Sequence, residues 1–224
     1  MRSLLQAYPF RLLSCMIIVT CVSVQTPMGA QENTTAKELN IKAMQLQSAG
    51  KLQDAADTYR KAIVLNPNGP AYHNNLALTL KDLDQLDAAE KEERIALKLK
   101  PKKPDYHYNL GLILEKENKA GLAEAEFRQA SAANALDGEF HYRLARVLRQ
   151  QGKLDEAQSE AKQALMLKPN EAAYHQVLGD ILLQSKREDE ALGEYKTAAE
   201  TGGPTISAEV KSKIDYLQQV LKTR

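Results

Sequence analysis

Four histidines are the residues in this chain with the clearest capacity for chemistry, because all of them recur at one spacing. Each is 34 residues from the next, and each follows an aromatic residue: His73, His107, His141 and His175. Imidazoles at a regular spacing could bind metal ions or relay protons. However, equivalent atoms of packed helices lie roughly 10 Å apart, whereas two imidazoles that share a Zn²⁺ each need a nitrogen about 2 Å from the ion. We therefore predict that the histidines pack between helices with a ring nitrogen hydrogen-bonded, with pH sensing by partly buried imidazoles as the alternative.

The sequence carries no other arrangement typical of a catalytic or metal site. It has no histidine or cysteine pair at metal-ligand spacing, no glycine-rich phosphate loop and no nucleophile paired with a base. Its carboxylates lie on charged helical faces, where solvation is the ordinary explanation. We therefore predict no catalytic residue, no cofactor and no metal, and we expect that the chain is not an enzyme by itself.

The 34-residue spacing extends beyond the histidines and organises most of the chain. Within residues 138–171, small and apolar residues recur in register with positions one spacing earlier and later: Leu144, Ala145, Leu148, Gly152, Ala157, Ala164 and Pro169. Their spacing predicts two short amphipathic helices that meet at a turn near Gly152. Two such helices cannot bury both of their faces alone, so stacked copies must supply the core.

This segment resembles the tetratricopeptide repeat, with a small residue at the eighth place, Ala at the twentieth and twenty-seventh, and Pro at the thirty-second. The resemblance implies an all-α fold, a right-handed superhelical α-solenoid of antiparallel helix pairs. Five copies follow one another: 36–69, 70–103, 104–137, 138–171 and 172–203. After Gly202, Gly203 and Pro204 break the helix, an apolar stripe predicts a C-terminal capping helix within residues 206–224.

Residues 1–30 have the layout of an export signal. Arg2 and Arg11 flank a mixed start that precedes an apolar run at 12–24, and Ala30 is a small residue that suits the last position before cleavage. The run is short for a bilayer span, which favours cleavage over a permanent anchor. Residues 31–35 would then form a polar lead-in to the repeats. We expect an exported mature chain, periplasmic or secreted.

Both cysteines, Cys15 and Cys21, lie in this segment, so its removal would leave a mature chain without a thiol. A second interpretation uses Cys21, since residues 18–21 loosely resemble the lipobox of bacterial lipoproteins, although Thr20 is unusual just before such a cysteine. Lipidation of Cys21, or an uncleaved anchor, would tether the chain to a membrane. We expect membrane contact only by these two routes.

The charge balance argues against nucleic acid as a partner. The formal net charge is +1 for 224 residues. A chain without a strong positive field lacks the electrostatic footprint of a nucleic-acid-binding protein. We expect a protein or peptide segment as the partner, and the oligomeric state stays open.

The resemblance also implies where a partner would bind, because the first helices of such repeats line a concave surface. The matching fifth, ninth and twelfth places give the candidate groove residues: Asn40, Met44, Asn74, Leu78, Lys81, Tyr108, Leu112, Tyr142, Arg146, Arg149, Gln176 and Asp180. Asparagine amides suit the main chain of an extended peptide, and the strip of Met44, Leu78 and Leu112 suits its apolar side chains.

Arginines dominate the groove surface expected in the fourth repeat. A guanidinium suits a carboxylate, so Arg146 and Arg149, with Arg143 nearby, predict recognition of an acidic part of the partner. The alternative is a solvated helix face on which nearby carboxylates neutralise these arginines: Glu115, Glu139 and Asp180.

Together these features predict a non-enzymatic, exported scaffold that binds a peptide or helix of a partner in its concave groove. Two alternatives stay open. The chain could be a membrane-tethered assembly or secretion factor, similar to lipoproteins of this repeat class that help build pili or the outer membrane. It could also be a regulatory subunit of a separately encoded enzyme.

Overall fold

The computed structural model describes residues 28–203 and 208–223, with side chains described from Thr35 onward. These residues form eleven helices and no strand, which confirms the predicted all-α class. The helices are α1 (Met28–Ser48), α2 (Leu52–Leu65), α3 (Pro70–Asp82), α4 (Leu86–Leu99), α5 (Pro104–Lys116), α6 (Ala120–Ala133), α7 (Gly138–Gln150), α8 (Leu154–Leu167), α9 (Ala172–Gln184), α10 (Glu188–Gly202) and α11 (Ala208–Lys222).

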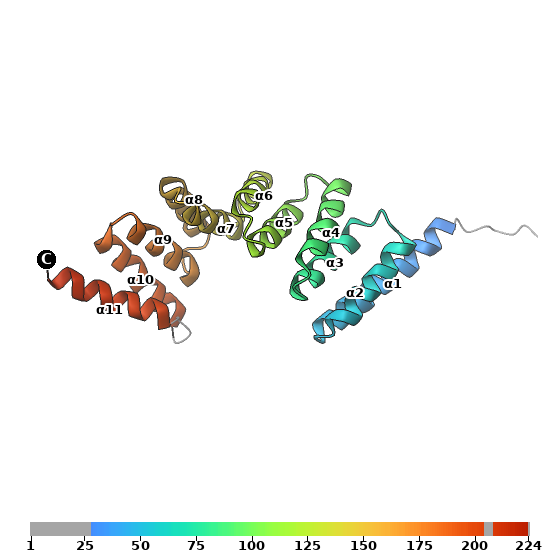
Figure 1. Cartoon of the computed structure of the whole chain (residues 1–224), viewed down its shortest axis with the longest axis horizontal. Helices are drawn as coiled ribbons and strands as arrows, with labels where there is room; N and C mark the ends of the chain where they lie inside the picture. Colours follow the sequence, from blue (N-terminus) through green and yellow to red (C-terminus); the bar gives the residue numbers. More distant parts are fainter. Residues whose placement is uncertain (1–27, 204–207, 224) are drawn as a thin grey trace, which may run out of the picture.

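Consecutive helices pack in pairs, and the pairs stack into an arch. Each odd-numbered helix from α1 to α9 packs against the even-numbered helix that follows it. Odd-numbered helices of neighbouring repeats also contact each other: α1 contacts α3, α3 contacts α5, and α7 contacts α9. Figure 1 shows α4, α6 and α8 on the outer side of the arch. Their partners α3, α5 and α7 therefore lie on its inner side, and the predicted solenoid of helix pairs is confirmed.

Small residues at fixed repeat places allow the helices to approach closely. The alanines at the twentieth and twenty-seventh places of all five repeats are fully buried: Ala55, Ala62, Ala89, Ala96, Ala123, Ala130, Ala157, Ala164, Ala191 and Ala198. A larger side chain at these places would push apart helices that already pack at the density of a protein interior. The recurrence of alanine is therefore a packing requirement.

Gly111 makes a close approach of this kind between two helices, and it carries a prediction. A Cβ added at Gly111 would lie 2.5 Å from Cε1 of Phe127. We expect Gly111→Ala to lower the free energy of unfolding by about 1–3 kcal/mol, the usual cost of overpacking. Gly193 in α10 is the matched control, because a Cβ there would meet nothing within 4 Å. Gly193→Ala should instead stabilise the chain by up to about 1 kcal/mol through helix propensity. Urea unfolding measures both, and equal effects would contradict the close approach.

The N-terminal helix is longer than the sequence pattern predicts. Helix α1 begins at Met28, ahead of Ala36, so residues 31–35 lie within a helix and do not form a separate lead-in. The sequence from Met28 to Ala36 holds no proline that would stop a helix. Most of the predicted export signal, with both cysteines, falls in residues 1–27 and lies outside the described residues.

Helix α11 covers the last repeat. Its Val210 and Leu217 are fully buried in the same apolar cluster as Tyr195 and Ala198 of α10. The cluster explains why the predicted stripe of apolar residues points inward, while Tyr216 is 60% exposed. No helix in the described ranges is long and apolar enough to cross a membrane.

Candidate functional site

Each of the four histidines forms the same clasp between the two helices of its repeat. The ring Nδ1 lies 2.7 Å from a glutamate carboxylate that is 19 residues further on: Glu92, Glu126, Glu160 and Glu194. The ring Nε2 lies 2.8 to 3.2 Å from the carbonyl oxygen of the residue six places earlier. The prediction of packed histidines with a hydrogen-bonded ring nitrogen is confirmed.

The clasp of the second repeat favours a protonated ring. The carboxylate of Glu92 and the carbonyl oxygen of Pro67 both accept, so the imidazolium form of His73 can donate to each of them. In the second repeat, the hydrogen bond to Glu92 raises the pKa of His73 above its ordinary value, against the opposing effect of burial, and the bond to the carbonyl of Pro67 adds to the rise. Among the described residues, no three His, Cys, Asp or Glu side chains converge as a metal site would need.

The candidate groove begins with a chain of asparagines across α1, α3 and α5. Asn109 donates to Asn74 at 2.7 Å, Asn74 donates to Asn75 at 3.1 Å, and Asn75 donates to Asn40 at 3.0 Å. The amides that we expected to meet a peptide main chain therefore bond to one another and hold the three inner helices in register. Each amide can make more hydrogen bonds than these contacts use.

An apolar strip runs beside these amides, as the sequence analysis places it. Met44 is 51% exposed, and Leu78 and Leu112 are half-buried. The neighbouring Ile41 of α1 is 55% exposed. The strip thus presents apolar surface on three successive inner helices.

The middle of the groove is held by a carboxylate that bridges three helices. Glu139 of α7 accepts hydrogen bonds from the hydroxyl of Tyr108 at 3.1 Å, the hydroxyl of Tyr174 at 3.2 Å and Nε of Arg143 at 2.7 Å. Burial raises the pKa of Tyr108 to about 12 and also raises that of Tyr174, so both phenols stay protonated and donate. Tyr142 stacks on Tyr174 with ring centroids 4.8 Å apart.

The groove arginines lie near carboxylates, as the alternative interpretation expects. The shortest nitrogen–oxygen distances are 2.7, 3.4 and 3.8 Å, for Arg143–Glu139, Arg146–Glu115 and Arg149–Asp180. Asp180 also accepts from the Tyr195 hydroxyl and from Nζ of Lys213 on α11, both at 2.7 Å. An acidic ligand at Arg149 would compete with this well-bonded carboxylate, whereas the longer contact of Arg146 leaves that guanidinium more available.

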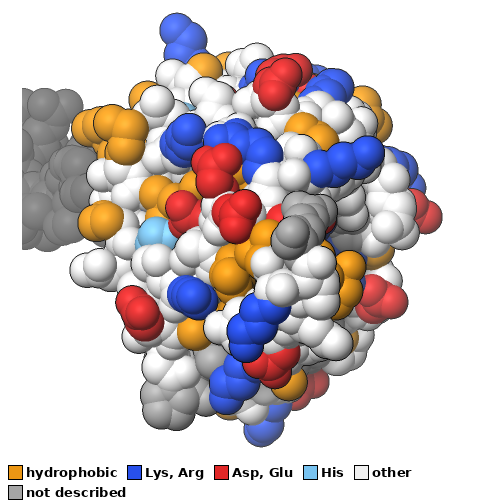
Figure 2. Space-filling model, turned by 90° about the vertical axis from the view of Figure 1, so that its left-hand side faces the viewer, with side chains coloured by type: hydrophobic (Ala, Val, Ile, Leu, Met, Phe, Trp, Pro, Cys, Tyr) orange, Lys and Arg blue, Asp and Glu red, His pale blue; other side chains and the backbone are white. Residues whose placement is uncertain are grey.

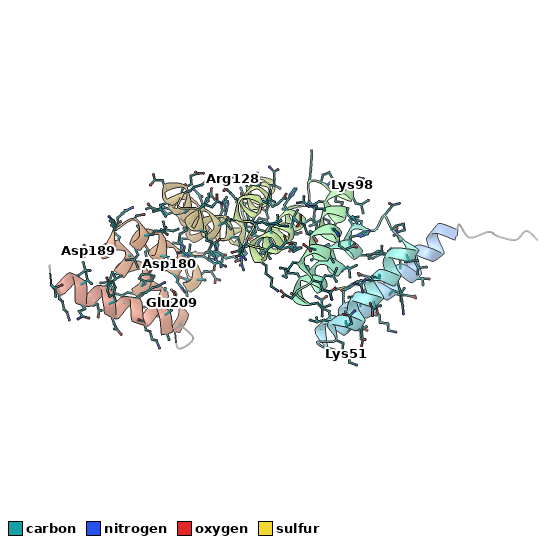
Figure 3. The ribbon with its side chains drawn as sticks, in the orientation of Figure 1. Lys51, Lys98, Arg128, Asp180, Asp189 and Glu209 are labelled. Carbon is teal, nitrogen blue, oxygen red and sulfur yellow. The ribbon has the colours of Figure 1, made fainter. Side chains whose placement is uncertain are left out.

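Two hollows on the inner side differ in charge. The first, of about 550 Å³, has four cationic side chains and one carboxylate in its lining, over Leu112: Lys81, Lys116, Arg143, Arg146 and Glu115. The second, of about 320 Å³, is balanced, because its lining includes Arg146 and Arg149 with Asp180 and Glu209, beside Tyr142 and Gln176. Opposite charges are also interspersed on the C-terminal face of the molecule in Figure 2, and Figure 3 places Asp180 and Glu209 near each other at that end.

One buried acid in the second repeat stands apart from these pairs. Glu93 of α4 is fully buried, and neither carboxylate oxygen has a hydrogen-bond partner in the part of the chain that is described. Burial raises its pKa to about 8, although Lys81 opposes the rise. It occupies the place held by Tyr59, Phe127 and Tyr195 in other repeats.

Sequence reasoning missed the glutamates of the four clasps. The signal was present, because these glutamates recur at the same spacing as the histidines. It also did not predict that Asn75 and Asn109 would join Asn40 and Asn74, since those contacts depend on how far one repeat is displaced from the next.

Comparison with known proteins identifies the repeat type. The sequence matches the description "Tetratricopeptide repeat" over residues 74–138, 108–161 and 142–205, and the description "TPR repeat" over residues 46–84. No curated protein sequence matches the chain.

Several solved structures share the fold at low sequence identity. The PilF structure of Pseudomonas aeruginosa is 20% identical with a TM-score of 0.75, and the alignment covers 86% of each chain. A MamA structure of Desulfovibrio magneticus RS-1 is 22% identical with a TM-score of 0.71, over 77% of this chain and 97% of that one. YrrB, "a TPR protein with an unusual peptide-binding site", is 20% identical with a TM-score of 0.67, over 87% and 97%.

Proposed function

Because the chain belongs to the tetratricopeptide repeat family, we propose that it is a non-enzymatic scaffold that holds an extended segment of a partner protein along its inner groove. The observation that carries this proposal is the continuity of two surfaces on the inner helices. The apolar strip on α1, α3 and α5 leads directly to the cationic hollow, because Leu112 belongs to both. YrrB, which is similar in fold, has a peptide-binding site.

The two surfaces define the chemistry of the segment. Apolar side chains would pack on Met44 and Leu78, while the asparagine amides would use their remaining capacity on its main chain. An acidic side chain further along would enter the hollow lined by Lys81 and Arg146, whose ion pairs are longer than those of Lys116 with Asp84 and Arg143 with Glu139 in the same hollow. The acidic position thus lies between the second and fourth repeats, and the balanced hollow at Arg149 contributes less.

A pair of matched double variants tests the proposal. Met44→Glu with Leu112→Glu places charge on the inner strip, and Val64→Glu with Leu122→Glu places the same charge on residues of α2 and α6 that are 80% and 52% exposed. Affinity capture from the cell envelope fraction, with the chain from residue 31, should lose its specific partner only with the inner variant. Thermal melts would verify that both variants fold. Retention of the same partner by the inner variant would refute the proposed groove.

We also propose that residues 1–30 direct export of the chain. The support is the apolar run at 12–24 and the small residue Ala30, which ends the segment six residues later. Mass spectrometry of the mature chain should find Gln31 as its first residue. Incorporation of a labelled fatty acid at Cys21 would instead establish the membrane-tethered form, and a Cys21→Ser variant distinguishes the two.

A further inference from the structure

A lysine-rich turn joins α4 to α5 on the outer side of the arch. Four lysines fall within residues 98–103: Lys98, Lys100, Lys102 and Lys103. Lys103 pairs with Asp105 at 2.5 Å. The other three side chains are exposed and form no hydrogen bond or ion pair with the rest of the described chain. Lys98 lies near the end of α4 in Figure 3.

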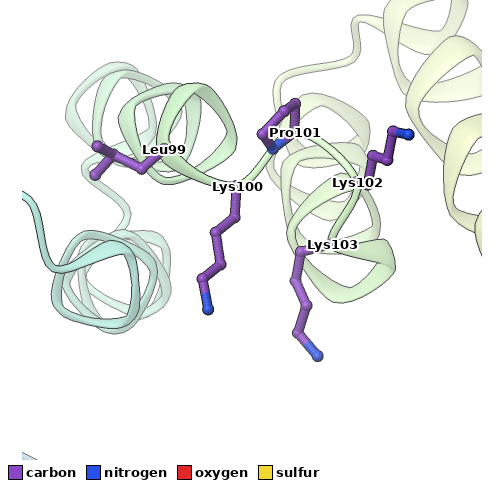
Figure 4. A pocket seen from close by; sticks show the side chains of 5 residues that line it. All are labelled: Leu99, Lys100, Pro101, Lys102 and Lys103. Atoms are coloured by element: carbon purple, nitrogen blue, oxygen red, sulfur yellow. The ribbon is translucent and has the colours of Figure 1, made fainter.

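The lysines lie around a small apolar surface formed by Leu99 and Pro101. A hollow of about 460 Å³ is lined by Leu99, Pro101 and the lysines at 100, 102 and 103. Figure 4 shows Lys100 and Lys103 pointing the same way from the two sides of this turn, while Lys102 points to the other side. A second hollow, of about 350 Å³, shares Pro101 and Lys102 and continues over Ala132 and Ala133 of α6.

The hydrogen bonds of His107 hold this turn in one conformation. Nε2 of His107 lies 2.9 Å from the carbonyl oxygen of Pro101, and Nδ1 of the same ring lies 2.7 Å from Glu126. The backbone nitrogen of Lys103 donates to the carbonyl of Lys100 at 3.3 Å. The lysines are therefore carried on fixed backbone, which lowers the entropy lost when a ligand binds.

Repeat packing does not require lysine at these places. The corresponding turns of the first, third and fourth repeats have the same backbone role with one lysine at most: Asn66-Pro67-Asn68-Gly69, Asn134-Ala135-Leu136-Asp137 and Lys168-Pro169-Asn170-Glu171. Of the four turns compared, the turn after α4 alone has several lysines without an ion pair in the described chain, although the formal net charge is only +1. The concentration of charge is thus local to this turn.

We propose that this lysine-rich turn is a second docking surface, separate from the inner groove, for an acidic segment of a partner protein that carries an apolar side chain among its carboxylates. The segment would cross the turn, so that one carboxylate meets Lys100 on one side and another meets Lys102 on the other side, and the apolar side chain would pack on Leu99 and Pro101. A flat anionic membrane fits less well, because Lys100 and Lys102 point to opposite sides of the turn (Figure 4).

A fluorescent peptide of alternating glutamate and leucine is a suitable probe, with anisotropy measured at low and high salt. Lys100→Glu with Lys102→Glu should raise its dissociation constant about tenfold at low salt, since two exposed charge pairs are lost. Lys168→Glu with Lys196→Glu changes the net charge equally at exposed lysines elsewhere and should leave binding nearly unchanged. A peptide with serine in place of leucine should bind more weakly to the wild-type chain.

Each other outcome would overturn the proposal. Equal loss in both double variants would show that only net charge matters. Unchanged binding in the turn variant would assign the peptide to the inner groove. Absence of binding by the wild-type chain at low salt would remove the surface, and binding only to phosphatidylglycerol vesicles, lost in the turn variant, would assign it to a membrane.

Discussion

Replacing Glu93 by Met should stabilise the chain by about 1–3 kcal/mol at pH 7, because the buried carboxyl group has no hydrogen-bond partner and a side chain of similar length and shape can take its place. Urea unfolding measures the difference. The neighbouring repeats support this substitution, since Tyr59 and Phe127 fill the same place and are fully buried. A destabilised Glu93→Met variant would show that the carboxyl group makes a favourable interaction.

The raised pKa of Glu93 also predicts how the stability of the chain changes with pH. With a folded-state pKa of about 8 against an ordinary value of 4.5, Glu93 holds its proton more tightly in the folded chain. The free energy of unfolding that comes from this tighter proton binding is therefore fully present below about pH 4.5. It is lost as the pH rises through about 8, at up to about 1.4 kcal/mol per pH unit.

His73 acts in the same direction, because its raised folded-state pKa gives stability that is lost as pH rises through that value. Glu93→Met should therefore flatten the fall in stability between pH 5 and pH 9 and leave a smaller part that depends on His73. A variant as steep as the wild-type chain would contradict the assignment of the buried acid.

Removing the Glu139 carboxylate should be among the most damaging changes on the inner face. Glu139→Ala takes away the acceptor of three hydrogen bonds that join α5, α7 and α9, and it leaves the hydroxyl of the buried Tyr174 without its partner. We expect a loss of about 2–4 kcal/mol in the free energy of unfolding.

A control at an exposed helical glutamate separates this effect from loss of charge. Glu38 of α1 is exposed, and its substitution by Ala should change stability by less than about 0.5 kcal/mol. Glu139→Gln is informative as well, since it keeps one acceptor and should recover part of the loss. If Glu139→Ala and Glu38→Ala had similar effects, the bridging role of Glu139 would be wrong.

The fold could be predicted from sequence because its information lies in recurring residues. Ala157 and Ala164 have equivalents in every repeat, and each of these alanines fills one place in helix packing. The histidines could be interpreted for the same reason, since a residue repeated with the period of the fold has a local structural role. The start of α1 at Met28 was not predicted, because no repeat signal reaches that far.

The groove could be predicted only in outline. The apolar residues Met44, Leu78 and Leu112 are all at least partly exposed, and the helix period alone predicts that they share one face of the repeats. The state of the polar residues could not be predicted. Asn74 bonds to Asn109, and Arg146 pairs with Glu115. Both contacts depend on distances between repeats, which sequence spacing does not give.

Photo-crosslinking from single positions tests the central claim most directly, because it records which face of the arch touches the partner. A photoreactive phenylalanine would replace Met44 or Leu112 on the inner helices, or Val64 or Met166 at positions that are 80% and 76% exposed on α2 and α8. The account predicts that one partner protein is crosslinked from both inner positions and from neither outer one. Adducts from the outer positions alone would contradict the claim that the inner groove holds the partner.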